Sequence, residues 1–256
     1  MAAPLSVAVI TLNEERNIRA CLESVKWAEE VVVCDSGSTD RTLGIAGDCG
    51  ARTFQDPWRG FSAHKNLALT RCTQPWILVL DADERVPPAL QAEIEAVLRA
   101  DGPADGYSLA RKNFFLGEWI RRGGWYPDRS LRLFRQGRGR FLPRAVHEAL
   151  EVEGSIGALA HPLEHYTYAS VGDFLRRMES YAALASGELF TSGRRTGVKD
   201  LTLRPAWTFL RMFVFQRGFL DGWRGLLLAG LYACYTLAKY ADLWEREHGI
   251  GGRVAR

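Results

Sequence analysis

The sequence lacks the glycine-rich motifs with which many proteins bind nucleotides. Neither the Rossmann pattern G-x-G-x-x-G nor the Walker pattern G-x-x-x-x-G-K-[ST] occurs in its 256 residues. Both patterns bring backbone N–H groups against the phosphates of a nucleotide. If this chain binds a nucleotide, a metal ion has to take the place of that phosphate cradle.

Cysteine is scarce and shows no paired spacing. The chain has five cysteines and no C-x-x-C motif, and Cys21 and Cys34 fall on apolar positions of expected elements. An odd set of this kind argues for reduced thiols and a cytoplasmic location. The N-terminal residues lead directly into an expected strand without a basic region or a long apolar core, so no signal peptide is expected.

The chain also lacks an apolar run long enough to cross a bilayer. Its longest uncharged stretch is residues 225–238, which as a helix would span about 21 Å of a hydrocarbon core about 30 Å thick. Residues 191–256 nevertheless carry 11 Lys and Arg against 5 Asp and Glu, whereas residues 1–190 carry 22 against 25. A basic, apolar end favours an anionic membrane surface over nucleic acid, and helices packed on the main domain are the alternative.

The hydrophobic pattern alternates between strands and helices in the first hundred residues. Strands are expected over residues 6–11, 31–34, 51–54 and 76–81. Asn13 is expected to cap a helix in which Ile18, Cys21, Leu22 and Val25 share a face, and further helices are expected over 61–70 and after Pro88. This alternation predicts an α/β fold with a mostly parallel sheet flanked by helices.

Polar residues follow three of the expected strands. Residues 11–14 read Thr-Leu-Asn-Glu, residues 35–40 read Asp-Ser-Gly-Ser-Thr-Asp, and Asp81 and Asp83 follow the apolar run 76–80. In a parallel sheet these strand ends lie at one edge, where open α/β sheets bind ligands. Two neighbouring carboxylates there predict a divalent cation that bridges a diphosphate, and a surface Asp-Ala-Asp turn is the alternative.

These three motifs, in this order and spacing, resemble those of the family 2 glycosyltransferases, which have the GT-A fold. Four segments farther along the chain are similar to the lipopolysaccharide-core branch of this family, which includes enzymes that add glucose to heptose. They read Trp-Tyr-Pro-Asp-Arg129, Leu-Arg-Leu-Phe-Arg135, Val-His-Glu148 and Gly-Phe-Leu-Asp-Gly222. The resemblance implies a GT-A domain over 1–204, with a nucleotide-binding half (1–105) and an acceptor-binding half (106–204). A helical, membrane-associating segment over 205–256 is expected to follow.

The resemblance implies roles for individual residues. It implies an inverting displacement in which a carboxylate deprotonates the acceptor hydroxyl and Mg²⁺ or Mn²⁺ stabilises the departing nucleoside diphosphate. Asp83 is the expected direct metal ligand, with Asp81 beside it. The residues implied to bind the nucleotide-diphospho-sugar donor are Thr11, Asn13, Glu14, Asp35, Lys65, Asp81 and Asp83.

The catalytic base and a third metal ligand are less clearly marked. Glu148 is the first choice for the base and Asp128 the second, and either could instead pair with a neighbouring arginine. His165 is favoured over His161 as a late imidazole ligand of the metal, although a loop histidine is more often structural. The spacing of these two histidines also suits a zinc pair, but no second pair of suitable ligands accompanies them.

Six arginines between Arg129 and His147, with no acid among them, predict either a solvated basic face or a wall that binds an anionic glycan or glycolipid acceptor. The expected location is the cytoplasmic face of the inner membrane, as a peripheral protein. Two other functions fit parts of the pattern. One is a haloacid-dehalogenase-like phosphatase, which wants Thr or Val where Arg85 stands, and the other is a non-catalytic membrane-surface adaptor.

Overall fold

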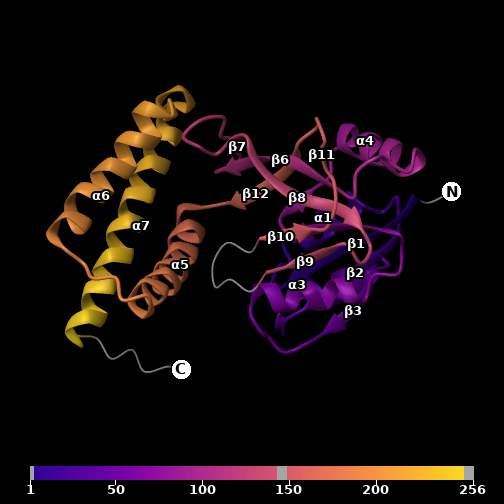
Figure 1. The fold of residues 1–256 in the computed structure, drawn as a ribbon, viewed down its shortest axis with the longest axis horizontal. Helices are drawn as coiled ribbons and strands as arrows, with labels where there is room; N and C mark the ends of the chain where they lie inside the picture. Colours follow the sequence, from indigo (N-terminus) through magenta and orange to yellow (C-terminus); the bar gives the residue numbers. More distant parts are fainter. Residues whose placement is uncertain (1–2, 143–148, 251–256) are drawn as a thin grey trace. The chain divides into compact units, whose positions relative to one another are not determined.

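The computed structural model describes residues 3–142 and 149–250, which form two compact units (Figure 1). The sheet unit consists of Met1–Lys112 and Pro127–Thr167, and the helical unit consists of Asn113–Tyr126 and Tyr168–Arg256. The expected boundary between residues 204 and 205 falls inside the helix Val198–Leu210, and the second segment of the helical unit begins at Tyr168.

The sheet has the strand order β3-β2-β1-β4-β8-β6-β12-β5. Its first four strands are parallel and β8 runs antiparallel to both β4 and β6. The α/β prediction is confirmed, and the parallel character belongs to the N-terminal strands. The strands on this path are β1 (Ala3–Thr11), β2 (Ala28–Asp35), β3 (Arg52–Gln55), β4 (Trp76–Asp81), β5 (Glu84–Arg85), β6 (Gly106–Phe115), β8 (Asp128–Arg135) and β12 (Leu163–Tyr168).

Shorter elements complete this part of the chain. β11 (Ile156–Ala158) and β7 (Glu118–Trp119) pair with β6, and β9 (Gly139–Phe141) pairs with β10 (Leu150–Val152). The helices are α1 (Ile18–Glu23), α2 (Thr42–Asp48), α3 (Phe61–Thr70) and α4 (Pro88–Arg99).

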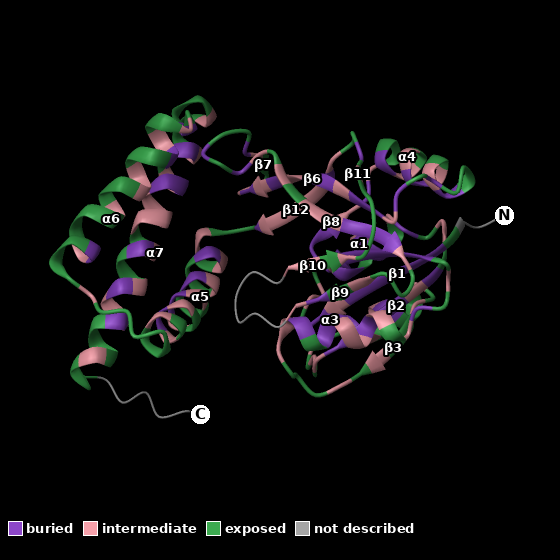
Figure 2. Cartoon of the chain, viewed as in Figure 1, coloured by how far each residue is buried: buried purple, intermediate pink, exposed green. Residues whose placement is uncertain are grey.

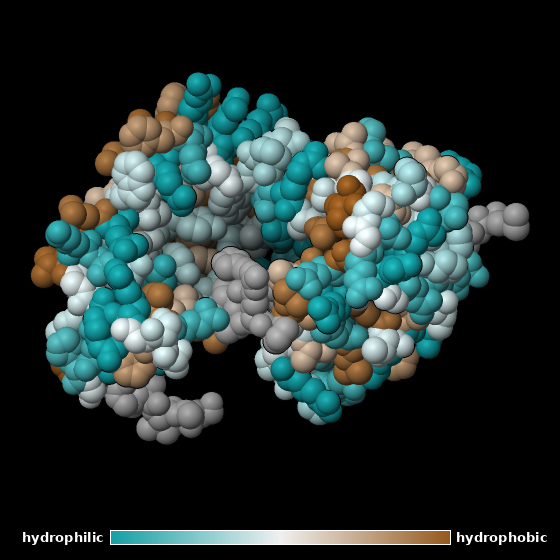
Figure 3. All heavy atoms as spheres, viewed as in Figure 1, coloured by the Kyte–Doolittle hydropathy of each residue, from teal (hydrophilic) through white to brown (hydrophobic). Residues whose placement is uncertain are grey.

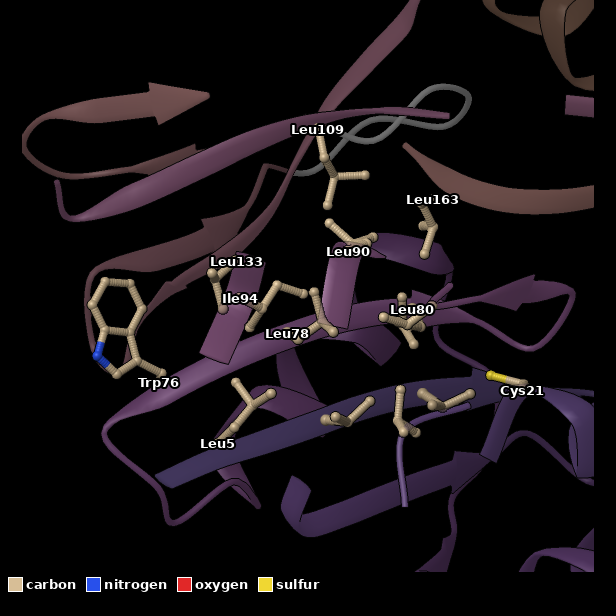
Figure 4. Close-up of a cluster of buried hydrophobic side chains, with 14 of the residues drawn as sticks. Leu5, Cys21, Trp76, Leu78, Leu80, Leu90, Ile94, Leu109, Leu133 and Leu163 are labelled. Atoms are coloured by element: carbon tan, nitrogen blue, oxygen red, sulfur yellow. The ribbon is translucent and has the colours of Figure 1, made fainter. Parts of the chain in front are cut away.

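Alternation along β1 divides the core of the sheet unit into two layers. Leu5, Val7 and Val9 are fully buried in a cluster that includes residues of α1, α2 and α4, whereas Ala8 faces a second cluster with Ala68 of α3. Figure 4 shows the first cluster, where Leu90 and Ile94 of α4 lie over Leu78 and Leu80 of β4. Burying a side chain such as Leu80 stabilises the fold by about 1.5–3 kcal/mol, so these layers hold the strand ends in place.

Asn13 does not cap a helix, contrary to the sequence-based expectation. The helix begins at Ile18, and Asn13 has a φ of +54° in the loop that follows β1. Its side-chain Oδ1 accepts a hydrogen bond of 2.8 Å from the N–H of Thr39, and its own N–H donates to the hydroxyl of Ser38. Asn tolerates this left-handed conformation, and bonds to a distant loop have replaced the local cap.

The helical unit contains α5 (Val171–Thr191), α6 (Val198–Leu210) and α7 (Gly222–His248). A π-helical turn (Arg211–Phe215) and a 3₁₀ turn (Gly218–Asp221) connect α6 to α7. Phe115, Trp125, Phe174 and Met212 belong to its buried core. Among the described residues, no helix combines the length and apolar character needed to span a bilayer.

Candidate active site

The strand ends chosen from the sequence lie at one edge of the sheet. In the parallel pairing of β1 with β2, Thr11 is the partner of Asp35, and in the pairing of β1 with β4, Ile10 is the partner of Asp81. The register therefore aligns the carboxyl ends of three neighbouring strands, as predicted. This is the edge at which an open α/β sheet offers a ligand-binding crevice.

Asp35 holds the loop that follows β2. Its carboxylate is fully buried and accepts hydrogen bonds of 2.8 Å from the N–H of Gly37 and 2.7 Å from the N–H of Ser38, while the Ser38 hydroxyl donates to its other oxygen. Gly37 has a φ of +110°, which favours glycine over any other residue. Asp35 thus fixes the position of the loop that contains Gly37 and Ser38, at the carboxyl end of β2.

The loop after β1 is tied to the loop after β2. The N–H of Glu14 donates to the Thr42 hydroxyl over 2.8 Å, and the Glu14 carboxylate accepts from the Asn17 side chain over 2.7 Å. Thr11 is 5% exposed, and within the described part of the chain its hydroxyl has no hydrogen-bond partner. Because a buried hydroxyl without a partner is costly, this group is available to a bound ligand.

Asp81 faces two cations of the protein. Its Oδ1 lies 3.0 Å from Nζ of Lys65 on α3, and its Oδ2 lies 3.1 Å from Nη2 of Arg132 on β8. Burial alone would raise the pKa of the Asp81 carboxyl, but Lys65 and Arg132 hold that pKa well below its usual range. Asp81 is therefore ionised and compensated by the chain itself.

Glu84 supports the turn that contains the two aspartates. Its side chain is fully buried and accepts hydrogen bonds from the backbone N–H of Asp81 at 2.9 Å and from Nη2 of Arg132 at 2.6 Å. Nη1 of Arg111 lies 3.6 Å from the same carboxylate. Burial raises the pKa of Glu84 in spite of the Arg132 cation. The sequence motif contains Glu84, but sequence reasoning missed its role and its two arginine partners.

Asp83 faces His165 of β12. Nε2 of His165 lies 3.5 Å from Oδ1 of Asp83, and both side chains are largely buried. The antiparallel pairing of β12 with β5 aligns His165 with Glu84, and the N–H of Tyr166 donates to the Asp83 carbonyl. Burial alone would lower the pKa of His165, but the Asp83 carboxylate beside it raises that pKa. The structure thus brings together two of the residues expected to bind a metal.

This pair fits a divalent cation that is shared with a substrate. In the ranges 3–142 and 149–250, no three or more His, Cys, Asp or Glu side chains are grouped so as to hold a metal. Mg²⁺ commonly binds one or two carboxylates and completes its coordination with water and phosphate oxygens. Asp83 supplies one carboxylate of that kind, whereas the imidazole of His165 is a ligand that softer divalent cations prefer, and Asp81 is compensated without a metal.

The remaining expected residues have different surroundings. Asp128 forms an ion pair with Arg111, whose Nε lies 2.9 Å and whose Nη2 lies 2.5 Å from Oδ2 of Asp128. His161 is exposed and its Nδ1 lies 2.9 Å from the Glu93 carboxylate. Glu148, the first choice for the base, lies outside the described residues.

The arginines between Arg129 and His147 do not form one uniform surface. Arg132 is 5% exposed and belongs to the ion-pair cluster, and Arg135 stacks over the Trp76 ring and pairs with Asp101. The other described arginines of this set, which are Arg129, Arg138 and Arg140, are exposed, and Arg144 lies outside the described residues. Arg132 is thus compensated within the chain, while the exposed members can meet a ligand.

The sequence profile of glycosyl transferase family 2 matches residues 6–150, which include all three strand-end motifs. The chain belongs to glycosyl transferase family 2. The lipopolysaccharide core biosynthesis glycosyltransferase LpsC of Rhizobium meliloti is 34% identical over 257 residues, which cover 98% of this chain and 95% of that protein. A glycosyltransferase of Rickettsia typhi is 27% identical and covers 94% of this chain and 87% of its own length.

A solved structure shows the same fold. The structure of residues 1–349 of S. aureus TarS in complex with UDP-GlcNAc matches 99% of this chain and 93% of that chain, with a TM-score of 0.50 and 18% identity. The GT-A fold is therefore confirmed, and the chain is a glycosyltransferase. The family assignment overturns the two other functions considered, a haloacid-dehalogenase-like phosphatase and a non-catalytic adaptor.

Proposed function

We propose that this glycosyltransferase transfers a sugar, with inversion and with the help of Mg²⁺ or Mn²⁺, from a nucleotide-diphospho-sugar to a lipopolysaccharide inner-core acceptor. The observation that carries the metal-dependent chemistry is the juxtaposition of Asp83 and His165 at the sheet edge that also presents Thr11 and Asp35. Glucose and a heptose acceptor are the donor sugar and acceptor that the resemblance favours.

The two carboxylates of the Asp81-Ala-Asp83 turn have separate tasks in this proposal. Asp83 and His165 would hold the cation, and a bound cation would neutralise charge on the departing nucleoside diphosphate. Asp81 remains paired with Lys65 and Arg132, and it would contact the ribose of the donor or orient a water molecule of the bound metal. The unpartnered hydroxyl of Thr11, together with Asn13, Glu14 and Asp35, lines the nucleoside pocket.

A carboxylate has to remove the proton of the acceptor hydroxyl as the new glycosidic bond forms. Asp128 is engaged by Arg111, whose Nε and Nη2 both contact Oδ2 of the carboxylate, so this side chain already has a partner within the chain. We therefore keep Glu148 as the base and Asp128 as the second choice. Proton transfer to Glu148 accompanies attack of the acceptor oxygen on the anomeric carbon, while the bond to the diphosphate oxygen breaks.

The acceptor is anionic in this proposal. The support is the 34% identity with an enzyme named for lipopolysaccharide core biosynthesis, together with the exposed arginines Arg129, Arg138 and Arg140. We further propose that the enzyme is a peripheral protein of the cytoplasmic face of the inner membrane. Support for that location comes from the basic, apolar character of residues 191–256.

A panel of nucleotide sugars tests the donor side without knowledge of the acceptor. Each compound is added to the full chain with Mn²⁺, Mg²⁺ or a chelator, and both the unfolding temperature and the release of nucleoside diphosphate are measured. One nucleotide sugar should raise the unfolding temperature in the presence of the metal, because a ligand at 100 times its Kd stabilises by about 2.7 kcal/mol. Equal stabilisation and equal turnover in the chelator would contradict the metal-dependent mechanism.

A further inference from the structure

The helical unit exposes large hydrophobic side chains from α6 to the first turn of α7. Leu203, Trp207, Phe215, Leu220 and Trp223 are between 55% and 67% exposed. Within α6 the only residue that is buried is Asp200, and Figure 2 shows the helix mostly in the colours of exposed and intermediate residues. We refer to the following residues as the docking face: Leu203, Trp207, Leu210, Val214, Phe215, Phe219, Leu220 and Trp223.

The members of the docking face are connected. Leu203, Trp207, Leu210 and Val214 follow one another at intervals of four, three and four residues, which places them on one side of a helix. The rings of Trp207 and Phe215 lie 5.4 Å apart. Figure 3 shows hydrophobic residues at the surface over α6 and the turn that follows it.

The docking face is separate from the core of the same helices. Met212, Leu228 and Ala229 point into the core of the helical unit and are at most 5% exposed. The exposed aromatic residues therefore add little to the packing of this unit. Contiguous exposed apolar surface of this kind marks a site of contact with a membrane or another protein.

The charges around the docking face are mostly basic. Between residues 201 and 241 the sequence has five basic residues and a single acid, Asp221. The Asp221 carboxylate accepts hydrogen bonds from the backbone N–H groups of Arg121 and Arg122, at 3.3 Å and 2.8 Å. Arg204, Arg211 and Arg217 are exposed beside the apolar residues. The surface is complementary to an apolar phase with anionic headgroups.

The start of α6 adds a hollow of about 670 Å³ to this surface. It is lined by apolar Val198, Leu203 and Trp207 and by the cations Arg194, Lys199 and Arg204. Asp200 pairs with two of these, Arg194 and Arg204. Apolar walls with a basic rim suit a lipid, whose acyl chain and anionic headgroup require both kinds of contact.

We infer that the docking face inserts its aromatic side chains among the lipids of an anionic bilayer, with Arg211 and Arg217 at the level of the headgroups. This inference rests on the proposed membrane association and deepens it, because it assigns the lipid contact to one face of the helical unit. Aromatic side chains at a membrane interface and arginines at the headgroups are the two attractions that hold an interfacial helix.

Vesicle binding by the full chain tests the inference. Flotation with vesicles of phosphatidylethanolamine and phosphatidylglycerol is compared between the wild type, the double variant Phe215→Ser with Phe219→Ser, and the double variant Arg211→Gln with Arg217→Gln. The aromatic variant should bind at least about tenfold more weakly, because each phenylalanine loses apolar burial. The arginine variant should lose about fivefold per charge. Vesicles of phosphatidylcholine should bind the wild type weakly.

The matched control is the double variant Leu175→Ser with Leu184→Ser, which removes two exposed apolar side chains of α5. It should bind vesicles like the wild type. Equal loss in this control, or unchanged binding by the aromatic variant, would overturn the inference. The inference would also be overturned if the wild type formed a dimer in buffer without vesicles and the aromatic substitutions dissociated that dimer. A second copy of the chain would then cover the docking face. Release of nucleoside diphosphate from the donor needs no vesicle. If no nucleoside diphosphate were released, that result would count against the proposed chemistry and not against the role of the docking face.

Discussion

Nζ of Lys65 lies 3.0 Å from Oδ1 of Asp81, so a cation from α3 neutralises the first aspartate of the Asp-x-Asp turn. Arg132 approaches the other oxygen of the same carboxylate at 3.1 Å. The second aspartate, Asp83, lies 3.5 Å from a histidine instead. Two carboxylates that are separated by one alanine in the sequence therefore have different electrostatic surroundings, and substitutions at the two positions should have different effects.

Asp83→Asn should abolish the response of the protein to metal. The amide replaces an anionic oxygen ligand, so the increase in unfolding temperature caused by Mn²⁺ together with the donor nucleotide sugar should disappear. Sugar transfer should fall by at least about 100-fold, since the departing diphosphate loses its cation. Thermal unfolding with and without Mn²⁺ checks the first effect. A variant that keeps both the metal-dependent increase and the activity would show that Asp83 is not a ligand.

Asp81→Asn should affect stability more than metal binding. The change leaves Lys65 and Arg132 facing a neutral amide, and removal of one partner from a buried ion pair typically costs about 3–5 kcal/mol. Because the Asp81 side chain is 29% exposed, we expect a smaller loss of about 1–3 kcal/mol. Urea unfolding measures it, and adding Lys65→Met to the variant should recover part of the loss. An additive double variant would argue against coupling of the two residues.

Local features of the sequence were enough to predict several elements and the edge of the sheet. The bounds of α3 and the end of β4 match the expected ranges, because both segments carry strong local patterns. Cys21 and Cys34 are buried as expected, and burial raises the pKa of the Cys34 thiol to about 11. The alignment of Thr11 with Asp35 followed from the parallel pairing of β1 with β2.

Contacts between distant parts of the chain explain what the sequence did not reveal. Arg132 stands between two leucines in an alternating strand, and nothing local shows that its guanidinium reaches Glu84, 48 positions away. Likewise, Asn13 looks like a helix cap until the loop at Ser38 and Thr39 is placed beside it. Such ion pairs and loop contacts depend on the order of strands in the sheet, which one sequence does not specify.

Arg132→Met should destabilise the fold rather than weaken acceptor binding alone. It leaves the fully buried Glu84 carboxylate with Arg111 at 3.6 Å as a remaining cation, and we expect a loss of about 3 kcal/mol in the free energy of unfolding. The double variant with Glu84→Gln should recover part of that loss. Arg138→Met is the matched control, because Arg138 is exposed on the same segment and its loss should change stability by less than about 0.5 kcal/mol. Equal losses in both arginine variants would contradict this prediction.

Glu148→Gln should separate proton transfer from donor binding. If Glu148 is the base, kcat for sugar transfer should fall by about 10²–10⁴-fold, the usual contribution of general base catalysis, while stabilisation by the donor and Mn²⁺ is unchanged. Asp128→Asn should reduce kcat less, because Asp128 is engaged by Arg111. The reverse order of the two effects, measured with the same donor and acceptor, would assign the base to Asp128.

Asp200 gives the helical unit a stability that depends on pH. Burial alone would raise the pKa of its carboxyl, but the N–H of Gly197 and the guanidinium groups of Arg204 and Arg194 lower that pKa below its usual value. A carboxyl with a lowered folded-state pKa stabilises the protein above its unfolded pKa of about 3.9, and this stabilisation is lost as the pH falls through the folded value. At pH 7, Asp200→Asn should therefore cost about 1 kcal/mol, because it removes the ion pairs with the half-exposed Arg194 and Arg204. The difference from the wild type should shrink as the pH falls below about 4 in denaturant unfolding, whereas Glu188→Gln, at an exposed position of α5, should have little effect at any pH. A difference that stayed constant over this range would show that the charge of Asp200 is not what stabilises the start of α6.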